Sequence, residues 1–183
     1  MKKVLKMIGK ILGIILLVIL VIGIIVYAFV LQYPKLKDDP KIGKWYRVTT
    51  SEMKTSEGDK YRALFKKGSE NKVLIYFAGG GVSCNEDMAR EDTYNTKEVA
   101  IDVEESPFED WSIILFPYAT GDFHAGTGEN HYTDTDGKEK ILYHNGYVNY
   151  TETMKKVMEQ AGINDADTVL VTGYSAGGFG PAG

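Results

Sequence analysis

The chain has 183 residues, one cysteine and a formal net charge of −4. Residues 1–33 contain four lysines and no acidic side chain, so the remaining residues hold 17 basic and 25 acidic side chains and carry a charge of −8. The acidic main part excludes a nucleic-acid-binding protein, the single cysteine excludes a disulfide scaffold, and 44% hydrophobic residues exclude general disorder.

The first predicted element is an apolar helix. Residues 11–31 contain no charged side chain, and a helix of this length spans about 30 Å, the thickness of the hydrocarbon core of a bilayer. The lysines lie only on the N-terminal side of this run, and Tyr27 and Tyr33 lie near its other end. Because basic flanks stay in the cytoplasm, we expect residues 1–33 to form a single-pass transmembrane signal anchor, with the rest of the chain extracellular.

Two other interpretations of this segment are open. A cleaved signal peptide has an apolar core of about 7–15 residues and ends at small residues in an A-x-A-like pattern. The core here is longer, and Val26-Tyr27-Ala28-Phe29 matches such a site poorly. The third interpretation is a buried helix of a soluble protein. The length of the apolar run favours the uncleaved anchor.

Residues 34–44 are polar, contain two prolines and are predicted to form a stalk. Residues 45–183 then form one domain, with predicted strands at residues 45–50, 61–65, 72–77, 111–116 and 168–172. The last three strands are nearly continuous apolar runs, which are typical of buried parallel strands.

One helix is predicted between the last two strands. Its apolar stripe has the spacing i, i+4, i+7, i+8, i+11 and consists of Tyr150, Met154, Val157, Met158 and Ala161. Gly162 is placed to cap its C-terminus. The order strand, long connection, strand, helix, strand is typical of an α/β fold. Asn149-Tyr150-Thr151 also matches the N-glycosylation pattern, which applies only in a secretory eukaryote.

Residues 118–144 show little periodicity and are rich in Gly, Thr, Asp and His. A connection of this length without regular structure is usually functional or disordered. His124 and His131 lie inside it, and His144 closes it. No two of these histidines have the spacing of zinc ligands on one element, so no metal site is predicted.

The strongest chemical signal is Gly173-Tyr174-Ser175-Ala176-Gly177, directly after the predicted strand at residues 168–172. This G-x-S-x-G pattern forms a nucleophile elbow when a buried strand leads into it. Its glycines let strand and helix approach closely, and the strained turn pushes the serine hydroxyl out over the end of the sheet. The amide of Ala176 then points at an oxyanion formed there. A plain glycine-rich turn with a solvent serine is the alternative.

Gly79-Gly80-Gly81 follows the strand at residues 72–77 and is the second candidate element of a site. Esterases take an oxyanion donor from a glycine-rich loop of this kind. A phosphate-binding loop is the rival interpretation, but the Walker pattern needs a lysine after the glycines, and the dinucleotide pattern G-x-G-x-x-G is missing. A plain turn is the third interpretation.

Four motifs in this order, FAGGGVSCN, PYATGDFHAG, HNGY and VTGYSAGG, resemble the pectinacetylesterase/Notum family. The resemblance runs from Lys72 to the C-terminus and implies a serine carboxylesterase with an α/β-hydrolase-like fold. It implies that Ser175 is the nucleophile and, aligned on Cys84, that the oxyanion donors are Gly81, Val82 and Ala176.

The chain departs from the family pattern at two points. Members such as Notum carry an aromatic residue where this chain has Val82, and eukaryotic members are rich in disulfides where this chain has only Cys84. We interpret Cys84 as a small semi-buried residue rather than a second nucleophile. The resemblance implies that His124 lines the substrate pocket. Asp122 is a second pocket candidate, and its other interpretation is a carboxylate that anchors the loop.

A catalytic serine needs a base and a carboxylate that orients this base. In α/β-hydrolases both follow the serine along the chain, but only eight residues follow Ser175. We therefore expect the fold to be truncated after the elbow, and the chain to be an inactive N-terminal fragment that lacks about 100 residues or more. His124 is the alternative base.

The sequence thus predicts a membrane-anchored, extracytoplasmic serine carboxylesterase of the pectinacetylesterase type that uses no cofactor. Its expected substrate is an acylated polysaccharide or another acyl ester. The family name implies an acetyl group, whereas Notum-like members accept a fatty acyl group. The alternative is a non-catalytic surface protein that uses the esterase scaffold to bind glycans or a partner. An Asp and a His downstream of Ser175 would favour the enzyme.

Overall fold

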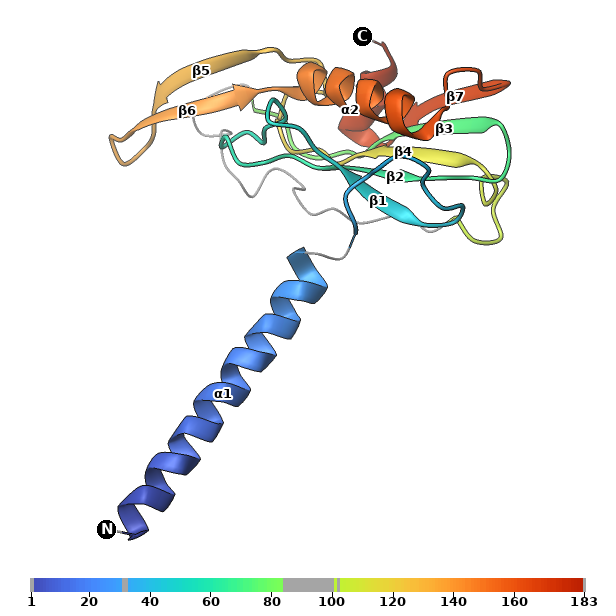
Figure 1. Ribbon diagram of the computed structural model, residues 1–183. Coiled ribbons are helices and arrows are strands. Elements are labelled where there is room, and N and C mark those ends of the chain that lie inside the picture. Colours follow the sequence, from blue (N-terminus) through green and yellow to red (C-terminus); the bar gives the residue numbers. More distant parts are fainter. Residues whose placement is uncertain (1, 31–32, 84–100, 102, 183) are drawn as a thin grey trace. The chain divides into compact units, whose positions relative to one another are not determined.

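A computed structural model describes residues 2–30, 33–83, 101 and 103–182 of the chain. The chain divides into two compact units, residues 1–34 and residues 35–183 (Figure 1). The first unit is helix α1 (Lys2–Val30). Among the described residues alone, no helix is long and apolar enough to cross a membrane. The transmembrane anchor predicted for residues 1–33 therefore has no support from the structure.

The second unit is built on a five-stranded sheet with the order β1-β2-β4-β3-β7. The strands are β1 (Trp45–Val48), β2 (Ala63–Lys66), β3 (Lys72–Phe77), β4 (Ser112–Phe116) and β7 (Thr168–Gly173). All five predicted strands are confirmed. β4, β3 and β7 run parallel, whereas β1 and β2 pair antiparallel with their neighbours. The sheet is therefore mixed rather than mostly parallel.

Hydrophobic clusters lie on both faces of the sheet. Side chains alternate between the faces along a strand, so neighbouring residues of one strand belong to different clusters. Ile75 of β3 lies in the main hydrophobic core together with Val157 of helix α2 (Gly146–Ala161). The next residue back along β3, Leu74, lies in a second, smaller cluster with Ile113 of β4. Burial of both faces explains why these strands have continuous apolar runs.

Helix α2 is confirmed, and Gly162 follows it in the left-handed conformation with φ of 62°. The predicted apolar stripe is wrong at one residue. Met158 was expected on the buried face of α2 but is 41% exposed, whereas Asn149 and Thr153 are buried. The Thr153 hydroxyl donates a hydrogen bond to the Asn149 carbonyl at 2.6 Å. A polar side chain can occupy a buried helical position when a local hydrogen bond satisfies it, so hydrophobicity alone does not predict this face.

β7 is an edge strand, and its side chains are exposed. Val169, Leu170 and Val171 have exposed fractions of 53%, 39% and 41%. The prediction that this strand is buried is wrong for the part of the chain that the structure describes, because β7 pairs there only with β3. An apolar edge of this kind is open to pairing with a further strand.

Residues 118–144, predicted to be one long irregular connection, contain a β-hairpin. β5 (Gly128–Thr133) pairs antiparallel with β6 (Glu139–His144), and the hairpin extends beyond the sheet (Figure 1). Asp134 holds the turn, since its Oδ1 accepts hydrogen bonds from two turn amides at 3.0 and 2.8 Å. The strands are mostly polar and exposed, so they lack the apolar alternation from which a strand is predicted.

Most of the predicted stalk belongs to the second unit. The side chain of Leu36 is 2% exposed and lies in the main core, and its amide donates to the Arg47 carbonyl at 2.9 Å. The Gly43 amide donates to the Lys67 carbonyl at 2.8 Å. Residues 35–44 therefore lie along the sheet domain.

Asn149 is a buried polar connection between α2 and the segment before β2. It is 2% exposed, and its Oδ1 accepts from the Lys54 amide and from Asn145 Nδ2, both at 3.0 Å. Its Nδ2 donates to the Lys54 carbonyl at 2.8 Å. The nitrogen that glycosylation would modify is thus already engaged inside the domain, so the sequence match does not mark an accessible site.

We predict that Asn149→Ala lowers the free energy of unfolding by about 2–3 kcal/mol, because it leaves the amide and the carbonyl of Lys54 without partners in a partly buried place. Urea denaturation followed by circular dichroism measures the change. Asn130→Ala, on the exposed hairpin, is the matched control and should change stability by less than about 0.5 kcal/mol. Equal effects of the two variants would contradict the structural role of Asn149.

Candidate active site

Ser175 lies where β7 ends and the short 3₁₀ helix η3 (Ser175–Ala182) begins. Its φ is +53°, a left-handed conformation that costs a residue other than glycine about 1–3 kcal/mol. The side chain is exposed, as a nucleophile must be. The predicted elbow is therefore present, with the serine at its strained position.

The two outer glycines of the elbow are required by close backbone packing. A Cβ on Gly173 would collide with the Gly177 carbonyl, and a Cβ on Gly177 would collide with the Phe77 carbonyl. The Tyr174 amide donates to the Phe77 carbonyl at 3.1 Å, and the Gly177 amide donates to the Tyr174 carbonyl at 2.9 Å. These contacts fix the turn against the end of β3.

The glycine-rich loop after β3 meets the elbow directly. Phe77 and Gly173 are paired across the parallel strands, so both loops leave the sheet at the same level. A Cβ on Gly79 would collide with the Tyr174 carbonyl and would lie 2.9 Å from the Cβ of Ser175. Gly81 and Val82 follow in the same loop, and both are half-buried.

Ala176 is the remaining predicted oxyanion donor, and its side chain is 6% exposed. It belongs to a small cluster with Tyr118, the second residue after β4. The ring of Tyr118 fills the space beside Gly80, where a Cβ would collide with it. No role was predicted for Tyr118, although it belongs to the motif PYATGDFHAG, which follows a buried strand.

Asp122 organises the loop between β4 and the hairpin. Its Oδ1 accepts from Thr120 Oγ1 at 2.6 Å and from the His124 amide at 3.0 Å. Its Oδ2 accepts from the amides of Gly126 at 3.2 Å and Gly146 at 2.8 Å. Because Gly146 is the first residue of α2, this carboxylate also caps the positive end of the helix. The geometry is that of a loop-anchoring carboxylate.

His124 is buried, and its Nε2 lies 2.9 Å from the Ala78 carbonyl. A carbonyl only accepts, so Nε2 carries the proton and donates. Burial lowers the pKa of His124 below its ordinary value of 6.5, while the hydrogen bond to Ala78 and the charge of Asp122 act in the opposite direction. The ring is thus a neutral donor, packed between Phe77 and Tyr118 at centroid distances of 5.0 Å.

None of the three histidines is bonded to the serine. The Nε2 of His124 contacts Ala78, the Nδ1 of His144 lies 3.2 Å from the Thr120 carbonyl, and His131 lies 3.9 Å from Glu129 on the exposed hairpin. Cys84 lies outside the described residues. Within the described ranges, no group of three or more His, Cys, Asp or Glu side chains could hold a metal ion.

Two cavities lie at different ends of the parallel strands. The smaller one, about 170 Å³, is mostly apolar and is lined by Phe77, His124, Ala125, Tyr147, Tyr150, Val171, Gly180 and Pro181. Because Gly180 and Pro181 belong to η3, this cavity lies on the side of the elbow. His124 is the one predicted site residue that lines it.

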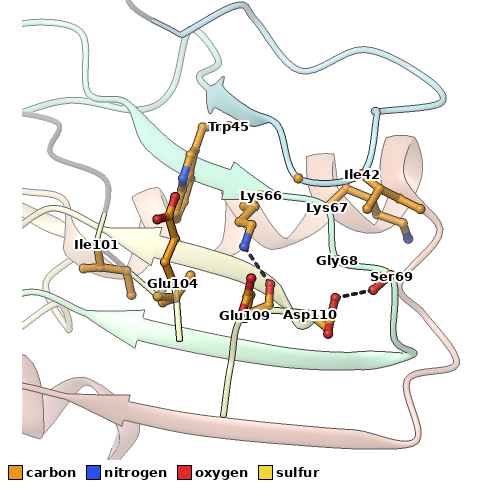
Figure 2. Close-up of a pocket in the computed structure, with 12 residues that line it drawn as sticks. Ile42, Trp45, Lys66, Lys67, Gly68, Ser69, Ile101, Glu104, Glu109 and Asp110 are labelled. Atoms are coloured by element: carbon orange, nitrogen blue, oxygen red, sulfur yellow. Dashed lines mark hydrogen bonds between the residues drawn. The ribbon is translucent and has the colours of Figure 1, made fainter. Parts of the chain in front are cut away.

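The larger cavity, about 350 Å³, lies at the end of the sheet where β3 and β4 begin (Figure 2). Trp45 and Ile101 form apolar walls, and the Nζ of Lys66 donates to the Glu109 carbonyl at 2.7 Å. Six residues of a strand separate this end from the elbow, a distance of about 20 Å. This cavity therefore contributes nothing to the chemistry at Ser175.

Comparison with known proteins agrees with this geometry. A family model described as pectinacetylesterase matches residues 60–182. A solved structure described as the Wnt deacylase Notum from Drosophila matches with a TM-score of 0.58 and 18% identity, over 80% of this chain and 45% of that chain. The structural match shows an α/β-hydrolase-type fold, and the chain spans less than half the length of that structure. None of the curated proteins matches the chain.

We predict that His124 makes the stability of the domain fall as the pH decreases from about 7 to about 5. Since its pKa is lower in the folded chain, the unfolded chain takes up the proton first, and acid favours unfolding. Urea midpoints at several pH values measure the slope. His124→Gln should flatten it, whereas His131→Gln, on the exposed hairpin, should keep the wild-type slope. A wild-type slope in His124→Gln would contradict the prediction.

Proposed function

Since the chain belongs to the pectinacetylesterase family, we propose that Ser175 is the nucleophile of a carboxylic ester hydrolase. The observation that carries the proposal is the exposed serine at φ +53°, with the glycine-rich loop packed against its Cβ through Gly79. A glycine-rich turn with no catalytic role would not need a strained serine at this place.

The proposed reaction proceeds through an acyl-enzyme. Ser175 Oγ attacks the ester carbonyl as its proton passes to a base, and the amides of Gly81, Val82 and Ala176 stabilise the oxyanion. Collapse breaks the ester bond, and the alcohol leaves with a proton. Water then attacks the acyl-serine and releases the carboxylic acid, which restores the hydroxyl.

The base and its carboxylate have to come from residues other than the described histidines. His124 uses Nε2 to bind Ala78, and Asp122 is engaged by four donors, so neither serves Ser175. In α/β-hydrolases the acid and the histidine follow the serine along the chain. We therefore propose that the base and its carboxylate follow Ser175 along the chain of the natural protein.

The proposed substrate is an acyl ester on a polysaccharide, with acetyl as the acyl group. The support is the description of the family, whose name specifies an acetyl ester of pectin. The similar solved structure is described as a Wnt deacylase, and that description concerns another protein of which the chain covers less than half.

A second function is favoured by one observation: in the described part of the chain, no base is hydrogen-bonded to Ser175. A protein of this kind would keep the esterase scaffold and bind glycans or a partner without turnover. The two functions differ in whether Ser175 is activated, which can be measured directly.

We predict that a fluorophosphonate probe labels the natural full-length protein and that Ser175→Ala abolishes the labelling, because only an activated serine reacts with this reagent. Ser51→Ala is the matched control, since Ser51 is exposed and far along the chain from the elbow. Gel fluorescence and mass spectrometry of the labelled peptide measure the result. A folded full-length protein that is not labelled would favour the binding protein, and labelling that survives Ser175→Ala would contradict the assignment of the nucleophile.

We also propose that the catalytic domain acts outside the cytoplasm, anchored in the membrane through residues 1–33. The support is the sequence alone, namely the lysines before the uncharged run at residues 11–31. Protease added to intact cells should then cleave the domain. Cleavage that occurs only after the cells are lysed would contradict this location.

A further inference from the structure

The glycine-rich loop is fixed at both ends by one neighbouring segment. At its start, the Ala78 carbonyl accepts a hydrogen bond from His124 Nε2 at 2.9 Å. At its end, the Ser83 amide donates to the Gly121 carbonyl at 3.0 Å. Gly81 and Val82 lie between these two anchor points. The segment at residues 121–124 therefore bridges the loop that contains the proposed oxyanion donors.

The first anchor point is itself part of the sheet. The Ala78 amide donates to the Phe116 carbonyl of β4 at 2.9 Å, so the backbone there is held on its donor side by a strand and on its acceptor side by His124. The orientation of the Ala78 carbonyl fixes the plane of the peptide group that leads into Gly79. Gly79 in turn lies against Tyr174 and Ser175.

The bridging segment has an unusual backbone that other contacts determine. Gly121, Phe123 and His124 all have positive φ, at 63°, 57° and 64°. The Phe123 amide donates to the Tyr118 hydroxyl at 3.0 Å, and the His124 amide donates to Asp122 Oδ1 at 3.0 Å. Two consecutive residues without glycine's freedom are thus held in the left-handed region, a feature found where geometry serves a site.

We propose that His124 is a positioning residue for the oxyanion hole: its Nε2–H holds the Ala78 carbonyl, and together with the Gly121 carbonyl it keeps the loop of Gly81 and Val82 in place beside Ser175. This inference rests on the proposed function of that loop. His124 acts through the backbone of Ala78 and takes no proton from the serine. Its neutral ring and its burial between Phe77 and Tyr118 suit a fixed donor.

The test compares three variants. His124→Phe keeps a planar ring but removes the donor, and His124→Gln restores an N–H group on a side chain of similar reach. His131→Phe makes the same change on the exposed hairpin and is the matched control.

The first measurement does not depend on activity. Backbone ¹⁵N relaxation of the 183-residue chain gives order parameters for the amides of residues 79–82. They should fall from rigid values of about 0.85 to below about 0.6 in His124→Phe, and stay high in His124→Gln and His131→Phe. Unchanged values in a folded His124→Phe would overturn the inference, whatever the fate of the proposed esterase.

The second measurement uses the natural full-length protein and an acetyl ester. His124→Phe should lower kcat about 10-fold to 100-fold with KM changed less than about threefold, because the loss is one of transition-state stabilisation and smaller than the removal of a donor itself. His124→Gln should recover most of kcat. An unchanged kcat in His124→Phe would overturn the inference.

If His124→Phe does not fold, the tautomer of the His124 ring in the wild-type protein tests the inference instead. A long-range ¹H–¹⁵N spectrum should show His124 as the neutral tautomer protonated at Nε2. A ring protonated at Nδ1 alone would overturn the inference, since it could not donate to Ala78. An absence of turnover and probe labelling in the wild type would instead be a failure of the proposed function, and it leaves the order parameters as the decisive result.

Discussion

The site depends on one constraint, the contact of backbone with backbone where β3 and β7 end. Three glycines stand at this junction: Gly79 against Tyr174 and Ser175, Gly173 against Gly177, and Gly177 against the carbonyl of Phe77. A side chain at any of these positions would collide with neighbouring backbone, so the elbow could not close against β3 and its loop. The absence of a side chain at Gly79 therefore permits the glycine-rich loop to pack directly against Ser175.

This constraint explains which parts of the molecule can be predicted. The elbow and the glycine loop leave a local signature, because glycine is required there by sterics and because an apolar strand precedes each of them. The exposure of β7 has no such signature. An apolar run of residues predicts a strand, but it does not show whether another element covers the side chains of that strand. The hairpin at residues 128–144 was missed because its strands are polar, and the burial of Asn149 because its partners lie on a distant segment, at Lys54.

The roles of Asp122 and His124 also could not be assigned from sequence. Both residue types suit catalysis, and the motif around them resembles part of an esterase family. The difference between a catalytic group and a supporting one lies in what each polar atom touches. Both carboxylate oxygens of Asp122 accept hydrogen bonds, from the turn and from the first amide of α2. The Nε2 of His124 donates to the Ala78 carbonyl. The carboxylate of Asp122 thus connects the strained turn to helix α2, and His124 connects that turn to the glycine-rich loop.

The parallel pairing of β3 with β7 has a consequence for the order of assembly. Lys72 is paired with Thr168, so the two strands of the site are separated by nearly a hundred residues of chain. At about 5–20 residues per second, synthesis delivers β7 roughly 5 to 20 seconds after β3. During that interval β1, β2, β4 and β3 can already form their ladder, while the glycine loop has no serine beside it. Ser175 is therefore synthesised after the strands that position the glycine loop, and it joins a loop that β3 and β4 already hold.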